Sequence, residues 1–130
     1  MTFTAGNTYL FPLSQSQTAH LWVICTDPNP DEQVLVVSLT SLNGSKDQTV
    51  ILHGGEHPFL RWATCVAYGL SELISCEMLR NHIQCGRAKM HANLGTEKTQ
   101  LILDGFLASD FTKKRILQFV RAYKEARRIS

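Results

Sequence analysis

Five polar side chains at the ends of apolar segments carry groups suited to acid–base chemistry: His20, Thr40, Ser41, Glu56 and His57. Histidine accepts or donates protons near neutral pH, and hydroxyl groups hold phosphate oxygens. RNA cleavage without a metal requires groups that deprotonate the 2′-hydroxyl, protonate the leaving oxygen and steady the phosphate. The set predicts His20 and His57 for proton transfer, and Thr40 with Ser41 at the phosphate. The alternative is that both histidines are strand-edge residues whose rings hydrogen-bond to the backbone.

The segment His53-Gly54-Gly55-Glu56-His57 invites comparison with a metal site. Its spacing differs from the His-Glu-x-x-His of helical zinc sites, and the two glycines disfavour a helix there. Because no third ligand is indicated, we predict no metal, and no motif predicts another cofactor. Two glycines alone do not make a phosphate-binding loop.

The first half of the chain is predicted to form a small, strongly bent antiparallel sheet. Short runs rich in strand-forming residues alternate with polar, Gly- or Pro-containing turns at 14–18, 27–31 and 43–47. The expected strands are 8–13, 20–26, 33–42, 49–52 and 63–68, the last ended by Gly69. Short strands with brief turns favour an SH3-like β-barrel over residues 1–70.

The second half is predicted to be a helical annex, residues 71–130, packed on the barrel in one α+β domain. Helices are expected after caps at Ser75, Thr96 and Thr112 (or Asp110), with a weak edge strand within 87–93. In the last helix one apolar stripe has helical spacing and favours packing on the body: Ile116, Phe119, Val120 and Tyr123.

Charge is unevenly distributed along the 130 residues, whose formal net charge is +2. Residues 113–128 hold seven Lys or Arg and one acid, whereas the preceding residues hold six Lys or Arg and ten acids. Such a basic element suits RNA or an acidic partner; the alternative is a solvated helix face. The residues expected to guide an RNA backbone are Arg61, Lys113, Lys114, Arg115 and Arg121.

The four cysteines do not form a Cys-x-x-Cys pair, and no secretory signal is evident. We therefore expect reduced thiols and a cytoplasmic protein. Cys25 and Cys65 lie within apolar strands, where a buried thiol is inert as a nucleophile. Apolar runs are shorter than the ~20 residues that span a bilayer, so no membrane segment is predicted.

Three segments of the first half resemble the small-barrel toxins of the MazF/PemK/Kid group. They are residues 7–10 (NTYL), 20–28 (HLWVICTDP) and 35–41 (LVVSLTS). Residues 55–59 (GEHPF), 66–68 (VAY) and 101–109 (LILDGFLAS) resemble more closely an uncharacterised bacterial branch of that group. The likeness to the barrel covers roughly residues 7–70, and the likeness to the branch covers most of the chain.

The resemblance implies a homodimeric toxin of a bacterial toxin–antitoxin system, a metal-independent endoribonuclease on single-stranded RNA that an antitoxin inhibits. Thr40 and Ser41 match the strand-end Thr/Ser that contacts the scissile phosphate in that group. His20 stands where the group begins its second strand with Arg-Pro, and the fifth strand lacks the Asp and Arg of Kid-like members. Two hypotheses follow: a toxin that uses His20 and His57, or a non-catalytic barrel that binds a protein partner or nucleic acid.

Overall fold

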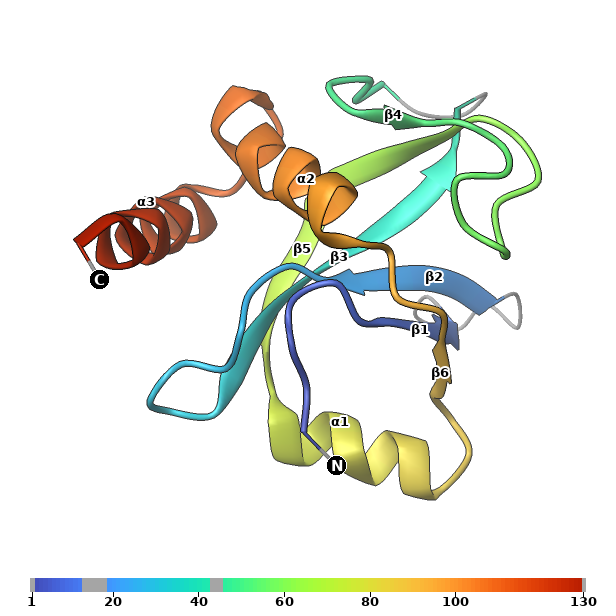
Figure 1. Ribbon diagram of the computed structural model, residues 1–130, viewed down its shortest axis with the longest axis horizontal. Coiled ribbons are helices and arrows are strands. Elements are labelled where there is room, and N and C mark those ends of the chain that lie inside the picture. Colours follow the sequence, from blue (N-terminus) through green and yellow to red (C-terminus); the bar gives the residue numbers. More distant parts are fainter. Residues whose placement is uncertain (1, 13–18, 43–45, 130) are drawn as a thin grey trace.

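The computed structural model describes residues 2–12, 19–42 and 46–129. The predicted turn at 14–18 lies outside these ranges, and so do residues 43–45 of the predicted turn at 43–47. Six strands form one curled antiparallel sheet in the order β4-β5-β3-β2-β1-β6 (Figure 1). The strands are β1 (Thr8–Pro12), β2 (Ala19–Ile24), β3 (Gln33–Ser41), β4 (Ile51–Leu52), β5 (Thr64–Ser75) and β6 (Lys89–His91). With three helices, the predicted α+β class is confirmed.

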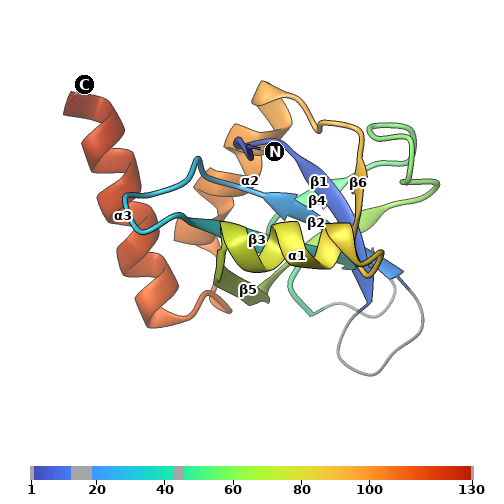
Figure 2. The same ribbon diagram turned by 90° about the horizontal axis from the view of Figure 1, so that it is seen from below.

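The central strands are apolar at nearly every position because the sheet is covered on both faces. Side chains alternate along a strand, so Leu21 and Val23 enter one hydrophobic cluster while Trp22 and Ile24 enter the other. Helices α2 (Thr96–Ala108) and α3 (Lys114–Ile129) contribute to the first cluster, and α1 (Cys76–Gln84) contributes to the second. Figure 2 shows α1 lying across the sheet on that second face.

Strand β5 corrects the prediction that the strand ends at Gly69. It continues to Ser75, and its register with β3 shifts between the pairs Val36↔Glu72 and Ser38↔Ala67. Two steps along β3, from residue 36 to 38, therefore correspond to five steps along β5, from residue 72 to 67, so residues 68–71 of β5 form a bulge. Glycine inside a strand often marks a bulge, which sequence alone does not distinguish from a strand end. Residue 70, the expected barrel boundary, lies inside this strand.

Three helix starts were predicted, with different success. Ser75 is confirmed as the cap of α1, since its hydroxyl accepts a hydrogen bond from the Met78 amide at 3.2 Å. Thr96 is not the cap of α2: Gly95 holds that position, at φ 96°, without a side-chain hydrogen bond. Thr96 is instead the first helical residue. Helix α3 begins at Lys114, so neither Thr112 nor Asp110 directly precedes it, and the Thr112 hydroxyl donates to the Phe106 carbonyl at 2.8 Å.

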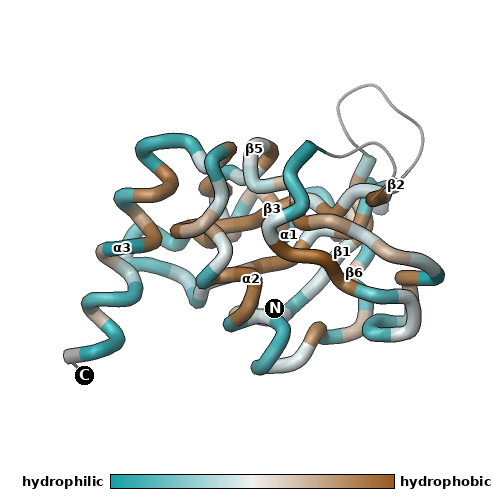
Figure 3. The backbone as a smooth tube through the Cα atoms, turned by 90° about the horizontal axis from the view of Figure 1, so that it is seen from above, coloured by the Kyte–Doolittle hydropathy of each residue, from teal (hydrophilic) through white to brown (hydrophobic). Residues whose placement is uncertain are grey.

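The apolar stripe of α3 packs on the body of its own chain, as predicted. Ile116 and Val120 are fully buried, and Phe119 and Tyr123 pack at the edge of the same cluster. The Tyr123 hydroxyl also accepts a hydrogen bond from the Asp27 amide at 3.2 Å. Figure 3 shows the resulting alternation of hydrophilic and hydrophobic residues along α3.

The weak edge strand predicted within 87–93 is confirmed as β6, which pairs with β1 through Thr8↔His91. The sheet thus draws strands from both expected segments of the chain. Within the described residues, none of the helices combines the length and apolar character that crossing a bilayer requires.

Candidate functional site

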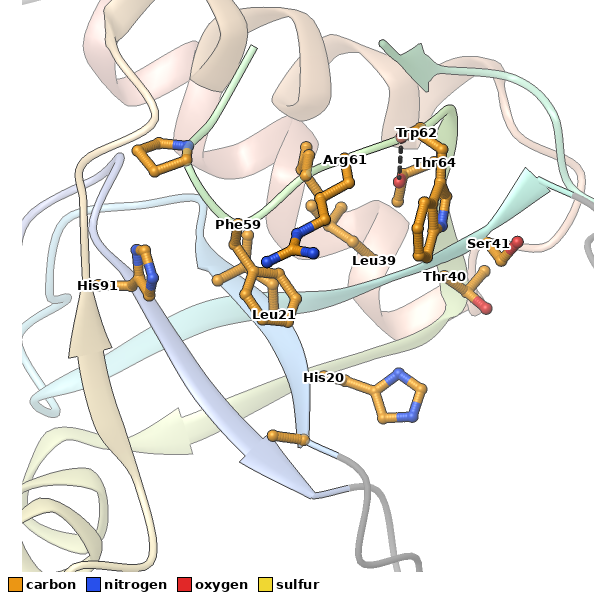
Figure 4. Close-up of a pocket in the computed structure, with 13 residues that line it drawn as sticks. His20, Leu21, Leu39, Thr40, Ser41, Phe59, Arg61, Trp62, Thr64 and His91 are labelled. Atoms are coloured by element: carbon orange, nitrogen blue, oxygen red, sulfur yellow. Dashed lines mark hydrogen bonds between the residues drawn. The ribbon is translucent and has the colours of Figure 1, made fainter. Parts of the chain in front are cut away.

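An open pocket of about 630 Å³ lies where the ends of β2 and β3 meet the 53–63 connection and β6 (Figure 4). Buried leucines of the first hydrophobic cluster, Leu21, Leu39 and Leu60, contribute apolar surface to it. Polar and aromatic side chains contribute the rest: His20, Thr40, Ser41, Phe59, Arg61, Trp62, Thr64 and His91, with Ala19 and Pro58. This combination of apolar surface and a few polar groups is typical of ligand sites.

Four of the residues predicted from sequence meet in this pocket: His20, Thr40, Ser41 and Arg61. The ladder between β2 and β3 pairs Trp22 with Ser38. The ladder ends at this pair, and His20 and Thr40 lie beyond it toward the ends of the two strands, where both residues line the pocket. The strand ends therefore bring together groups that lie far apart in sequence.

Two exposed aromatic rings flank Arg61. The Trp62 side chain is 66% exposed and Phe59 is 39% exposed, which is unusual for residues of this size. Figure 4 shows the Arg61 side chain extending into the pocket toward Phe59, with the Trp62 ring on the other side near Thr40. Sequence reasoning selected Arg61 and missed both aromatics, although the run Phe59-Leu60-Arg61-Trp62 carries the signal of basic and aromatic residues interleaved.

His57 does not line this pocket, so the structure separates it from His20. Its side chain is 2% exposed, and the Phe59 amide donates to Nδ1 at 3.0 Å. Nε2 lies 2.7 Å from the Ala92 carbonyl oxygen and 3.3 Å from Oγ1 of Thr8. Burial lowers the pKa of His57, partly opposed by the Ala92 hydrogen bond, and the neighbouring His91 lowers it further. The alternative interpretation, a histidine bonded to backbone, describes His57.

His91 occupies the pocket wall and was missed by sequence reasoning. The pairing of β6 with β1 brings it there, across more than eighty residues of sequence. Its Nδ1 accepts a hydrogen bond from the Ala92 amide at 2.9 Å, so the ring proton of the neutral form is on Nε2. Its ring lies 5.9 Å from that of Phe59 in an edge-on arrangement. Nothing in the local sequence distinguishes His91 from an ordinary surface histidine.

The basic residues expected to guide RNA, other than Arg61, lie outside the pocket. Lys114, Arg115 and Arg121 are exposed on α3, and the exposed Lys113 immediately precedes it. Figures 1 and 2 show α3 at one end of the molecule, and Figure 1 shows the loop after β4 toward the other. The stripe that buries one face of α3 against the body turns its basic face toward solvent.

The segment 53–57 closes into a turn. The Glu56 carboxylate accepts a hydrogen bond from the His53 amide and lies 3.9 Å from Nζ of Lys98. Within residues 2–12, 19–42 and 46–129, no three His, Cys, Asp or Glu side chains cluster closely enough to hold a metal ion.

Comparison of the chain with protein-family models, with curated proteins and with solved structures finds no match.

Proposed function

We propose that the protein binds single-stranded RNA in the pocket at the ends of β2 and β3 and cleaves it without a metal ion. The observation that carries the proposal is that His20, Thr40, Ser41 and Arg61 line one pocket together with two exposed aromatic rings. We further propose that the curled sheet is an SH3-like barrel with a helical annex, related to the MazF/PemK/Kid toxins.

Binding would rest on stacking and on charge. Unpaired bases stack on exposed aromatic side chains, and each stacked base contributes about 1–3 kcal/mol. Trp62 and Phe59 supply such rings, and Arg61 of the same pocket supplies a planar cation for the linking phosphate. In an intact duplex the bases are already stacked and paired, so the site suits single strands.

Cleavage would proceed by attack of the RNA on itself. His20 accepts the proton of the 2′-hydroxyl, and the 2′-oxygen forms a bond to the phosphorus. The bond from phosphorus to the 5′-oxygen breaks, that oxygen takes a proton from a water molecule, which in turn receives the proton held by His20, and a 2′,3′-cyclic phosphate remains. Arg61 and the hydroxyls of Thr40 and Ser41 hold the charged phosphate oxygens. His57 has no part in this step, because the fold uses both of its ring nitrogens.

The second candidate is a module that binds RNA, or an acidic protein partner, without cleaving it. The burial of His57 favours it, since this removes one of the two histidines expected to transfer protons. The described pocket lining also lacks a carboxylate that could replace it.

The test is incubation of mixed single-stranded RNA with the protein in EDTA, beside His20→Ala, Arg61→Gln and the remote control Lys114→Gln. Cleavage by the wild type and by Lys114→Gln, with at least a hundredfold loss in His20→Ala, is the expected result. Cleavage that survives in His20→Ala refutes the assigned site. Binding without product, weakened in Arg61→Gln alone, moves the assignment to the second candidate.

The roles in a toxin–antitoxin system, as a homodimer inhibited by an antitoxin, rest on the resemblance alone. They predict that induced expression arrests bacterial growth and that His20→Ala relieves the arrest. Sedimentation of the purified protein tests the dimer. Unimpaired growth at high expression of soluble protein would contradict the toxin role.

A further inference from the structure

The buried ring of His57 joins two parts of the fold next to the pocket. Its Nδ1 accepts from the Phe59 amide at 3.0 Å, and its Nε2 lies 2.7 Å from the Ala92 carbonyl. Thr8 of β1 donates its hydroxyl to the same carbonyl at 2.6 Å. The ring thus connects the 53–63 segment to the residue that follows β6.

These contacts determine the protonation state of the ring. An amide N–H donates to Nδ1, so Nδ1 is unprotonated, and Nε2 carries the proton that it donates to Ala92. Addition of a second proton would leave the Ala92 bond in place. It would put an N–H on Nδ1 directly opposite the N–H of Phe59, where two donors face each other and the bond is lost.

Phe59 is the residue that this bond positions. Its side chain lines the pocket and contacts the ring of His91, which itself lies 5.0 Å from the ring of His57. The neighbouring Leu60 is anchored in the core and donates its amide to the His57 carbonyl at 2.9 Å. Loss of the Phe59 bond would therefore loosen the pocket wall locally without unfolding the segment.

We infer that neutral His57 is a positioning residue that holds Phe59 against the pocket. Proton uptake by His57 then releases Phe59 and weakens RNA binding, an effect that rests on the proposed RNA-binding function. Of the charged or titratable groups around it, His91 faces the ring from β6. On its own segment the adjacent Glu56 is paired with Lys98 of α2, and Arg61 extends into the pocket.

The direction in which RNA affinity changes with pH distinguishes this inference from a simple change in the charge of the pocket. Burial lowers the pKa of His57, so the free fold prefers the neutral ring and resists the proton until the pH is acidic. Any positive charge that the pocket gains as the pH falls would strengthen binding of an anionic strand. Weaker binding at acidic pH therefore points to His57, and stronger binding contradicts the inference.

Two substitutions test the two hydrogen bonds of the His57 ring one at a time. His57→Gln can keep a donor toward Ala92 but offers no acceptor at Nδ1, and it imitates the acidic state at every pH. His57→Asn can keep the acceptor for Phe59 and loses the donor. Neither side chain titrates, so both remove the proton linkage that histidine provides.

The experiment measures binding of a fluorescein-labelled 2′-O-methyl oligoribonucleotide, which cannot be cleaved, between about pH 7.5 and pH 5 at constant ionic strength. Wild-type affinity should fall with acidity by at most about tenfold per pH unit, the limit for one proton. His57→Gln should bind weakly throughout, and His57→Asn should lose the acidic weakening. Wild-type affinity that rises monotonically with acidity, or equal acidic weakening in all three proteins, overturns the inference.

Hydrogen exchange at the Phe59 amide in the free protein gives a readout independent of RNA. The protection factor of this amide should fall in the wild type at acidic pH and should already be low in His57→Gln at neutral pH. If protection falls as expected but no oligonucleotide binds, the proposed function fails while the positioning role of His57 stands. Protection that is unchanged by pH and by His57→Gln refutes the positioning role itself.

Discussion

Substitution of Gly105 by alanine gives a stability change whose sign depends on tertiary packing. Gly105 lies inside α2, where alanine is usually more favourable than glycine by about 1 kcal/mol. In the fold, however, an added Cβ would lie 1.9 Å from Oη and 2.7 Å from Cζ of Tyr68, and 2.7 Å from Cγ2 of Val50. Neither neighbour can yield easily, because both are buried in the core.

The expected magnitude follows from what must move. Inserting a methyl group into a packed core costs about 1–3 kcal/mol. Displacing Tyr68 also breaks the 2.7 Å hydrogen bond that its buried hydroxyl donates to the Ile102 carbonyl, which costs about 1–3 kcal/mol more. Subtracting the helix preference of alanine leaves a net destabilisation of about 1–5 kcal/mol. The sign is therefore opposite to the one that helix propensity predicts.

Urea unfolding followed by far-ultraviolet circular dichroism measures this change, with Tyr68→Phe as the matched background. Tyr68→Phe removes the closest atom, so Gly105→Ala should cost about 1–2 kcal/mol less in that background than in the wild type. An unchanged or raised midpoint in Gly105→Ala would refute the packing described between α2 and β5. Equal costs in the two backgrounds would exclude the Tyr68 hydroxyl as the source.

Three further outcomes are expected. Cys85 is the exposed thiol, and Cys25, Cys65 and Cys76 are buried. A thiol reagent such as Ellman's should therefore label one cysteine per native chain and all four in denaturant. Rapid labelling of more than one cysteine in the native chain would contradict this burial. Asp47 is 7% exposed, and its carboxylate accepts hydrogen bonds from the Thr49 hydroxyl and, at 2.8 Å, from the Ser109 hydroxyl. Asp47→Ala should therefore lower the free energy of unfolding by about 2 kcal/mol in urea titrations. An unchanged midpoint would show that these hydrogen bonds contribute nothing to stability. Burial lowers the pKa of His57 below its ordinary 6.5, so the unfolded chain binds this proton at a higher pH than the folded chain does. The contribution of neutral His57 to the free energy of unfolding is therefore full above about pH 6.5 and declines as the pH falls toward the folded-state pKa. Paired urea titrations should show a smaller loss of stability at acidic pH in His57→Gln than in the wild type.

The fold was predictable from sequence where the pattern is local. The apolar runs around Trp22 and Val36 gave the central strands, since positions facing both hydrophobic clusters are apolar. The helical spacing of Ile116 and Val120 gave the buried face of α3. Gly69 was misread as a strand end because a glycine at a bulge and a glycine after a strand look the same in sequence.

The candidate site was predictable in part. His20, Thr40 and Ser41 were recognised from residue type and position at the ends of predicted strands, and Arg61 from its charge. All four line one pocket. His57 and His91 could not be told apart, because the difference between a locked and a pocket-lining histidine depends on contacts made by Ala92 after β6 has paired with β1.

By itself, the sequence determined which segments become strands or helices and which of their faces are apolar, because these properties repeat with the local period of the backbone. Tertiary structure alone decided which faces meet. The pairing of β6 with β1 brings His91 to the pocket, the packing of α3 turns its basic residues away from it, and the neighbours of His57 remove that ring from solvent. Such contacts join residues distant in the chain, and the local period of a segment carries no information about its partner.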